Sequence, residues 1–92
     1  MLNTDSSEVV QFLKRWHESG RADFERQNTK LVYDEYAQKI ATTRRKYIAA
    51  DFVERGQRSG QFLIDRATGD VFSIRGYGVP HQLIGHITDL FW

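Results

Sequence analysis

Two short runs of alternating side chains flank one tight turn, and this arrangement constrains the fold more than any other part of the chain. The runs are Gln61–Asp65 and Asp70–Arg75, and the turn between them ends at Gly69. Alternation with a period of two is typical of a β-strand with one buried face. Glycine suits the last turn position because it adopts positive φ without steric hindrance. We therefore predict a β-hairpin, with Leu63 and Val71 on a partly covered face. Its buried face is predicted to carry Phe62, Ile64, Phe72 and Ile74.

The N-terminal part of the chain predicts helices. Asp5-Ser6-Ser7-Glu8 has the form of a capping box, with Asp5 as the cap, and an apolar stripe from Val9 to Trp16 follows at helical spacing. These features predict a helix over residues 6–18, ended by Gly20. A second helical segment is predicted from about Ala22 to Thr42, because tyrosine and aliphatic side chains repeat there at helical spacing. One bent helix and two short helices are both open.

The remaining sequence predicts strands and turns. Lys46–Phe52 alternates and is predicted as a strand, although Ala49 and Ala50 would also suit a helix. Val53–Ser59 is rich in polar residues and is predicted as an exposed connection. Gly76–Pro80 is predicted as a corner, and the following residues as a short edge strand over 82–87 or a helical turn over 87–91. The two terminal rings, Phe91 and Trp92, are expected to be docked or to form part of an interface.

Together these elements predict one α+β domain over residues 1–92. Two N-terminal helical segments, in about residues 5–43, are expected to pack on a three-stranded antiparallel meander in about residues 46–92. The predicted core consists of Val9, Phe12, Leu13, Trp16, Tyr36, Ile40, Ile48, Phe52, Phe62, Ile64, Phe72 and Ile74.

The stretch from Ser59 to His81, SGQFLIDRATGDVFSIRGYGVPH, resembles a segment found in many small phage and prophage proteins. Lys46-Tyr47-Ile48 upstream and Gly85 downstream fit the same pattern, so the resemblance covers about half of the chain. It implies a phage or mobile-element origin and an antiparallel C-terminal sheet. It implies no catalytic residue, because such proteins are mostly uncharacterised.

Composition narrows the classes of function. The chain has no cysteine, its net charge is +1, and its longest apolar runs are far too short to cross a bilayer. We therefore expect a soluble, cytoplasmic protein with no membrane partner. Charge is unevenly placed, because residues 39–75 carry eight basic and four acidic side chains, whereas residues 1–38 carry five basic and seven acidic ones. The middle of the chain is thus predicted to present a positive patch.

The residue pattern predicts neither a catalytic nor a metal site. The spacing of His81 and His86 does not suit two ligands on one helix face, and His17 lies far away in sequence. The acids mostly neighbour basic residues, which is typical of solvated ion pairs. The sequence Gly76-Tyr77-Gly78 lacks the lysine and helix that follow a phosphate-binding loop. We therefore expect no catalytic residue, no metal ligand and no cofactor.

The preferred functional hypothesis is a small non-enzymatic binding protein of phage type. It would inhibit or modulate a host protein or nucleoprotein complex, and anti-defence proteins such as anti-CRISPR inhibitors belong to this size class. Direct binding of nucleic acid by the arginine-rich face is the first alternative, and a homodimeric interaction module is the second. The candidate partner-binding or nucleic-acid-binding residues are Arg44, Arg45, Arg58, Arg66, Arg75, Tyr77 and Trp92.

Overall fold

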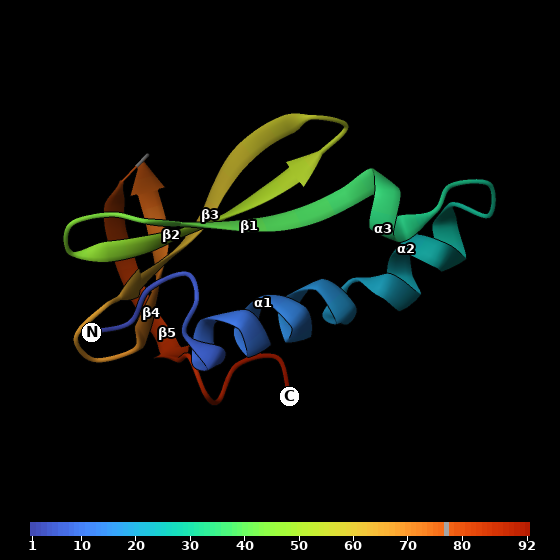
Figure 1. Cartoon of the computed structure of the whole chain (residues 1–92). Helices are drawn as coiled ribbons and strands as arrows, with labels where there is room; N and C mark the ends of the chain where they lie inside the picture. The colour runs from blue at the N-terminus through green and yellow to red at the C-terminus, as the bar shows by residue number, and fades with distance from the viewer. Residues whose placement is uncertain (77) are drawn as a thin grey trace.

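The computed structural model describes residues 1–76 and 78–92, in which helices precede an antiparallel sheet (Figure 1). The helices are α1 (Ser7–Ser19), α2 (Arg21–Gln27) and the single turn α3 (Tyr33–Tyr36). The strands are β1 (Ala37–Thr43), β2 (Tyr47–Glu54), β3 (Gln57–Asp65), β4 (Asp70–Gly76) and β5 (Val79–His86). Among the described residues, no helix is both long and apolar enough to cross a membrane.

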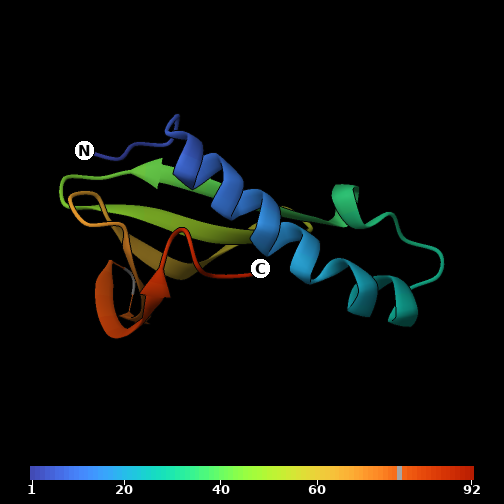
Figure 2. The same ribbon diagram turned by 90° about the horizontal axis from the view of Figure 1, so that it is seen from below.

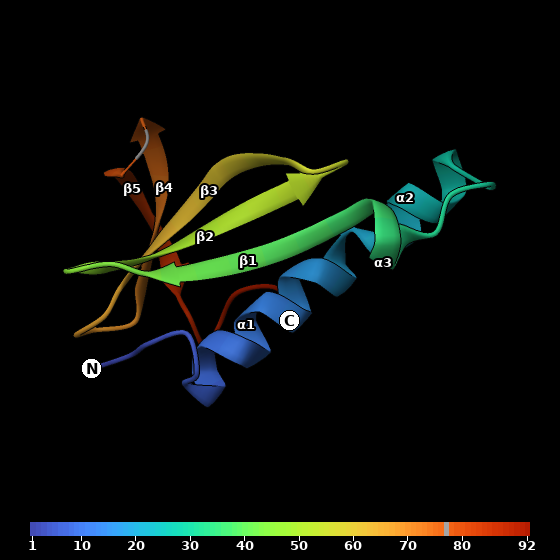
Figure 3. The ribbon, with the colours of Figure 1, turned by 45° about the horizontal axis from the view of Figure 1, so that its top comes forward.

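The five strands form one sheet in the order β1-β2-β3-β4-β5, and each pairs with its sequence neighbour in antiparallel fashion. Helix α1 lies along one face of this sheet, while α2 and α3 extend past its end (Figures 2 and 3). The sheet twists strongly, so that the β4–β5 hairpin stands steeply against β1 and β2 (Figure 3). This arrangement forms a helix layer on a sheet layer, with a strongly bent sheet.

The predicted three-stranded meander packed against two N-terminal helical segments is therefore wrong. The sheet gains β1 on one edge, in the stretch that was expected to continue the second helix to Thr42. Tyr33, Tyr36, Ala37 and Ile40 do repeat at helical spacing, but the helix stops after one turn at Tyr36. From Ala37 onward the chain pairs with β2 over seven residues, and this tertiary pairing outweighs the local helical pattern.

The predicted register of the hairpin about Gly69 is also wrong. Both strands exist, but the four-residue turn places Ile64 opposite Val71 and Leu63 opposite Phe72. Residues directly opposite each other share a face, so Val71, not Phe72, joins Ile64 on the side facing α1. Val71 and Leu63 are both buried, which shows that both faces of this hairpin are covered.

The main core lies between α1 and the sheet. Its buried members are Val9, Phe12, Trp16, Ile48, Ala50, Ile64, Val71 and Ile87. The ring of Phe62 packs against those of Trp16 and Phe12, at centroid distances of 4.9 and 5.9 Å. Phe91 packs on Phe12 as well, so one of the two terminal rings is docked in this core. These contacts confirm the helix-facing part of the predicted core.

Other predicted core residues are less enclosed than expected. Ile40 is 37% exposed because it lies on the edge strand β1, on the face away from α1. The ring of Phe72 packs edge-on against Tyr47, on the face opposite to the main core. Buried residues that the prediction omitted include Tyr33, Ala37, Val71 and Ile87.

Smaller local predictions also need correction. Helix α1 begins at Ser7 as expected to within one residue, but its cap is Ser6 and the side chain of Asp5 caps nothing. The expected connection over 53–59 is a tight hairpin, because β2 continues to Glu54 and β3 begins at Gln57. The last strand, β5, forms the second edge of the sheet and begins earlier than expected, at Val79.

Candidate functional site

Two turns at one end of the sheet bring together three of the predicted arginines. The side chain of Arg66, in the β3–β4 turn, donates from Nη1 to the backbone oxygens of Arg44 and Arg45 at 3.0 and 3.2 Å. Its Nε also donates to the backbone oxygen of Leu2, at 2.8 Å. Arg66 therefore clamps the β1–β2 turn and the N-terminal segment beside its own turn, at the same end of the molecule (Figures 1 and 3).

The clamped β1–β2 turn carries three consecutive cationic side chains, Arg44, Arg45 and Lys46, all of which are exposed. We call these three residues together with Arg66 the basic turn. Asp65 lies nearby, but its Oδ1 accepts the amide hydrogens of Ala67 and Thr68 and thereby shapes the β3–β4 turn. The basic turn thus presents a dense positive charge on a rigid backbone.

The other predicted binding residues do not join the basic turn. Arg58 forms an ion pair with the buried carboxylate of Asp51, at 2.5 Å, and donates to Thr42. Arg75 is exposed near the end of β4, at the opposite end of that strand from Arg66. Trp92 is 88% exposed and stacks on the guanidinium of Arg15, beside α1. Tyr77 lies outside the described residues.

A second candidate site, which the sequence did not reveal, is a cavity between the helices and the open end of the sheet. Its volume is about 520 Å³, which is within the range of small-molecule sites. We call it the aromatic pocket, because five rings and one lysine line it: Trp16, Phe24, Tyr33, Tyr36, Phe52 and Lys39. Glu54 also lines the aromatic pocket and accepts a hydrogen bond from the hydroxyl of Tyr36.

Lys39 is half-buried and surrounded by rings. Its Nζ lies 5.5 Å from the ring centroid of Trp16, 5.2 Å from that of Tyr33 and 4.8 Å from that of Phe52. Nζ also donates to the hydroxyl oxygen of Tyr33 at 3.0 Å. Burial lowers the pKa of Lys39, because a low-dielectric environment disfavours the charged ammonium.

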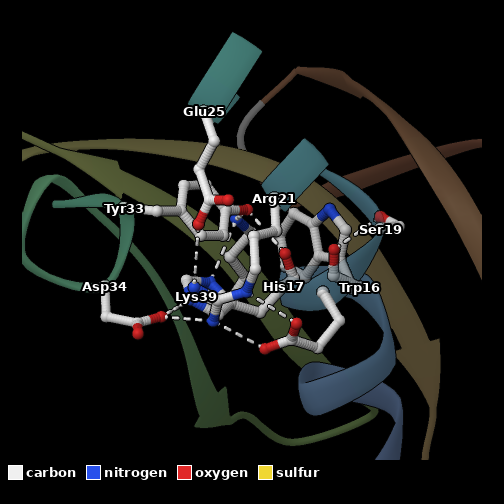
Figure 4. A network of polar contacts seen from close by, with 9 residues as sticks. Trp16, His17, Ser19, Arg21, Glu25, Tyr33, Asp34 and Lys39 are labelled. Atoms are coloured by element: carbon white, nitrogen blue, oxygen red, sulfur yellow. Dashed lines mark hydrogen bonds and ion pairs between the residues drawn. The ribbon is translucent and has the colours of Figure 1, made fainter. Parts of the chain in front are cut away.

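Side chains from helices α1 and α3 converge on Lys39 (Figure 4). The Nδ1 atom of His17 lies 3.4 Å from Nζ, and the Nε2 atom of the same ring lies 2.7 Å from a carboxylate oxygen of Asp34. The imidazole stacks on the ring of Tyr33, whose hydroxyl donates to the backbone oxygen of His17. This network fixes helix α1 to α3 and to strand β1.

Arg21 closes the outer side of the network (Figure 4). Its guanidinium donates to Glu18 and to Asp34, each at 2.7 Å. The hydrogen bond from Arg21 lowers the pKa of Asp34 below its ordinary value, with a second contribution from His17. The same guanidinium lowers the pKa of Glu18. In contrast, burial raises the pKa of Tyr33, and the hydrogen bond to Glu54 raises that of Tyr36.

Sequence reasoning missed this site because it assigned Lys39 to a helix. In a helix, Tyr33, Tyr36 and Lys39 would have lain on one side of that helix. Nothing in the sequence would then have placed His17 beside them. The break at Tyr36 instead turns Lys39 inward, on the face of β1 that pairs with Phe52. Only the density of rings between Phe24 and Tyr36 could have indicated a pocket.

Among residues 1–76 and 78–92, no three histidine, cysteine or acidic side chains gather in a way that could hold a metal ion. Comparison of the chain with protein-family models, with curated proteins and with solved structures finds no match.

Proposed function

We propose that this protein is a small non-enzymatic binding protein that modulates a partner protein or nucleoprotein by covering an acidic surface with its basic turn. The observation that carries this proposal is the clamp made by Arg66, which holds the backbone of Arg44 and Arg45 in place. Because the clamp fixes the backbone before binding, ordering this turn adds little to the entropic cost of association. Arginine is also a residue type that often dominates binding interfaces.

The contacts of Tyr47 favour a protein surface over single-stranded nucleic acid. Binding to unpaired bases needs exposed ring faces beside the cations. Tyr47 follows the basic turn directly, but its ring packs edge-on against Phe72 and lies under the ammonium of Lys46. Phe62 is likewise engaged with Trp16 in the main core. The rings described near the basic turn are therefore occupied within the protein.

The resemblance of residues 59–81 to segments of phage and prophage proteins supports a host protein or complex as the partner. Under this proposal the protein acts by occlusion, and an anti-defence role is one form of it. The partner would present clustered carboxylates, or phosphates held within a nucleoprotein, that match the charge of the basic turn.

The proposal is tested by charge reversal within the basic turn. Affinity capture from host lysate, read by mass spectrometry, would compare the parent with Arg45→Glu/Lys46→Glu. The matched control is Lys14→Glu/Lys30→Glu, which makes the same change in net charge at exposed positions elsewhere. We expect one stoichiometric partner to be retained by the parent and the control and lost by the basic-turn variant. Thermal melts of all three proteins would show whether the fold is kept.

Equal recovery of the partner with the basic-turn variant and with the control variant would contradict the proposal. Recovery of nucleic acid alone, with binding that falls steeply and logarithmically with salt, would favour the alternative of direct nucleic-acid binding.

A further inference from the structure

Lys39, His17 and Asp34 have the geometry of a nucleophile, a base and an orienting group. Asp34 accepts from Nε2 of His17 at 2.7 Å, so the hydrogen of the neutral imidazole is placed on Nε2. The lone pair of Nδ1 then points to Nζ of Lys39, 3.4 Å away. An acceptor at this position can take a proton from the lysine, and this arrangement is the one that activates side-chain nucleophiles.

The surroundings of Lys39 make its ammonium easier to deprotonate than that of an exposed lysine. Among the described residues no carboxylate forms an ion pair with Nζ, which donates instead to the hydroxyl of Tyr33. The three ring faces attract an ammonium, whereas burial disfavours it. Burial lowers the pKa of Lys39, and no carboxylate partner in the described part of the chain opposes that shift.

The aromatic pocket supplies room for a ligand next to this amine. The rings of Phe24, Tyr36 and Phe52 line it, so a flat aromatic group can lie against them. Glu54 lies on the same wall, which disfavours an anionic ligand by charge repulsion. A neutral aromatic compound with a group that reacts with amines fits these surroundings best.

We propose that the aromatic pocket binds neutral aromatic aldehydes covalently and reversibly, as an imine on Lys39. The neutral Nζ attacks the carbonyl carbon, and one proton passes from nitrogen to the former carbonyl oxygen by way of His17. The resulting carbinolamine then loses that hydroxyl group and a second nitrogen proton as one molecule of water. A carbon–nitrogen double bond remains, and the addition of water reverses the reaction.

The hydroxyl of Tyr33 and the carboxylate of Asp34 act as positioning groups in this scheme. The hydroxyl oxygen of Tyr33 accepts from Nζ at 3.0 Å, and its ring stacks on the imidazole of His17. Tyr33 therefore positions both the amine and the base. Asp34 selects the imidazole tautomer. This site lies between α1, α3 and β1, away from the basic turn, and it does not depend on the function proposed above.

The test uses the intact parent protein and needs no substitution. Benzaldehyde with cyanoborohydride at pH 7.5 converts each imine into a stable secondary amine, and peptide mass spectrometry measures the rate at every lysine. Lys14, Lys30 and Lys46 are exposed and serve as internal references. Because burial lowers the pKa of Lys39, a larger fraction of this amine than of an exposed lysine is uncharged at pH 7.5, so we expect Lys39 to react severalfold faster than each of the three references. A rate at Lys39 no higher than at the three references would overturn the proposal.

Two further comparisons separate the parts of the site. Propanal reacts as an amine-directed aldehyde but lacks a ring, so the preference for Lys39 should be smaller with propanal than with benzaldehyde. An equal preference would show that the aromatic pocket does not select the ligand.

His17→Gln should reduce the rate at Lys39 and leave the rate at Lys46 unchanged. Unchanged reactivity of Lys39 in this variant would exclude His17 as the base.

Discussion

At the scale of single residues, Asp51 is a buried carboxylate that needs a charged partner. It is 1% exposed, and it is the buried charged side chain among the residues that the structure describes. Its carboxylate lies on the face of the sheet opposite to α1 and accepts from Nε of Arg58 at 2.5 Å. Arg58 also donates to Thr42, so one guanidinium links strands β1, β2 and β3. Arg58 is therefore primarily a structural residue, although the sequence suggested a binding role.

Arg58→Ala is expected to destabilise the protein more than Asp51→Ala. Loss of Arg58 leaves a buried carboxylate without its ionic partner, which costs about 3 kcal/mol. Loss of Asp51 leaves a half-exposed guanidinium that can turn to water, so its cost should be smaller. The double variant Arg58→Ala/Asp51→Ala should recover part of the stability lost in Arg58→Ala. Chemical denaturation of the three variants measures these differences, and equal costs for the two single variants would contradict this account.

At the scale of elements, the turn between β3 and β4 decides which side chains share a face. It has four residues, so the positions that pair across it add to an odd number, and an even-numbered residue meets an odd-numbered one. Counting from the turn would have paired Ile64 with Val71, but the prediction placed Ile64 on the same face as Phe72 and Ile74 instead. Gly69, at φ 81°, ends this turn, and it is packed tightly against His86 and Ile87.

Gly69→Ala is expected to cost more than Gly56→Ala, although both glycines have nearly the same positive φ, 81° and 77°. Each substitution incurs the left-handed backbone penalty of about 1 kcal/mol. A Cβ at Gly56 meets open space, whereas one at Gly69 would lie 2.7 Å from the ring of His86 and 3.1 Å from Ile87. Thermal melts should therefore show the larger decrease for Gly69→Ala. A similar decrease for both variants would show that the packing around Gly69 is unimportant.

Elements with a strong local signal were predictable, and elements set by pairing were not. Helix α1 and strands β3 and β4 were predicted in type because their side chains repeat at the period of a helix or of a strand. Strand β2 was also predicted in type, although Ala49 and Ala50 would have suited a helix as well. Strand β1 was missed because its residues also fit a helix, and only pairing with β2 decides between the two. Arg44, Arg45 and Arg66 were all among the predicted binding residues, and the structure brings these three together. The hydrogen bonds of Arg66 to its backbone acceptors, and the contact of His17 with Lys39, join residues that are far apart in sequence, so no local pattern indicates them.

At the scale of the whole molecule, the shape is elongated, with extents of 41 × 25 × 23 Å. Helices α2 and α3 form one end and extend past the sheet (Figure 3). Arg21 connects this end to the body, because it binds Glu18 of α1 and Asp34 of α3. The aromatic pocket lies at this same junction, so its shape depends on how firmly α2 and α3 are held.

Arg21→Met is expected to lower the melting temperature at neutral pH more than Arg26→Met does. Arg26 is the matched control, because it pairs only with Asp23 of its own helix among the described residues. Arg21 lowers the pKa of Asp34 and of Glu18, so its contribution to the stability of the folded state is complete above the ordinary carboxylate pKa of about 4. That contribution is lost as the pH falls through the lowered pKa values of the folded state. The difference between the two variants should therefore shrink in acid, and a pH-independent difference would contradict this assignment.

The mutual contact between Leu2 and Arg66 has a practical consequence for how a partner is sought. The amide of Leu2 donates to the backbone oxygen of Arg66, whose side chain donates back to Leu2, so the start of the chain is fastened beside the basic turn. A purification tag fused ahead of Met1 would emerge next to the surface proposed to bind, and could shield it. Attachment after Trp92 would leave that surface uncovered, so bait proteins tagged at opposite ends should differ in what they capture.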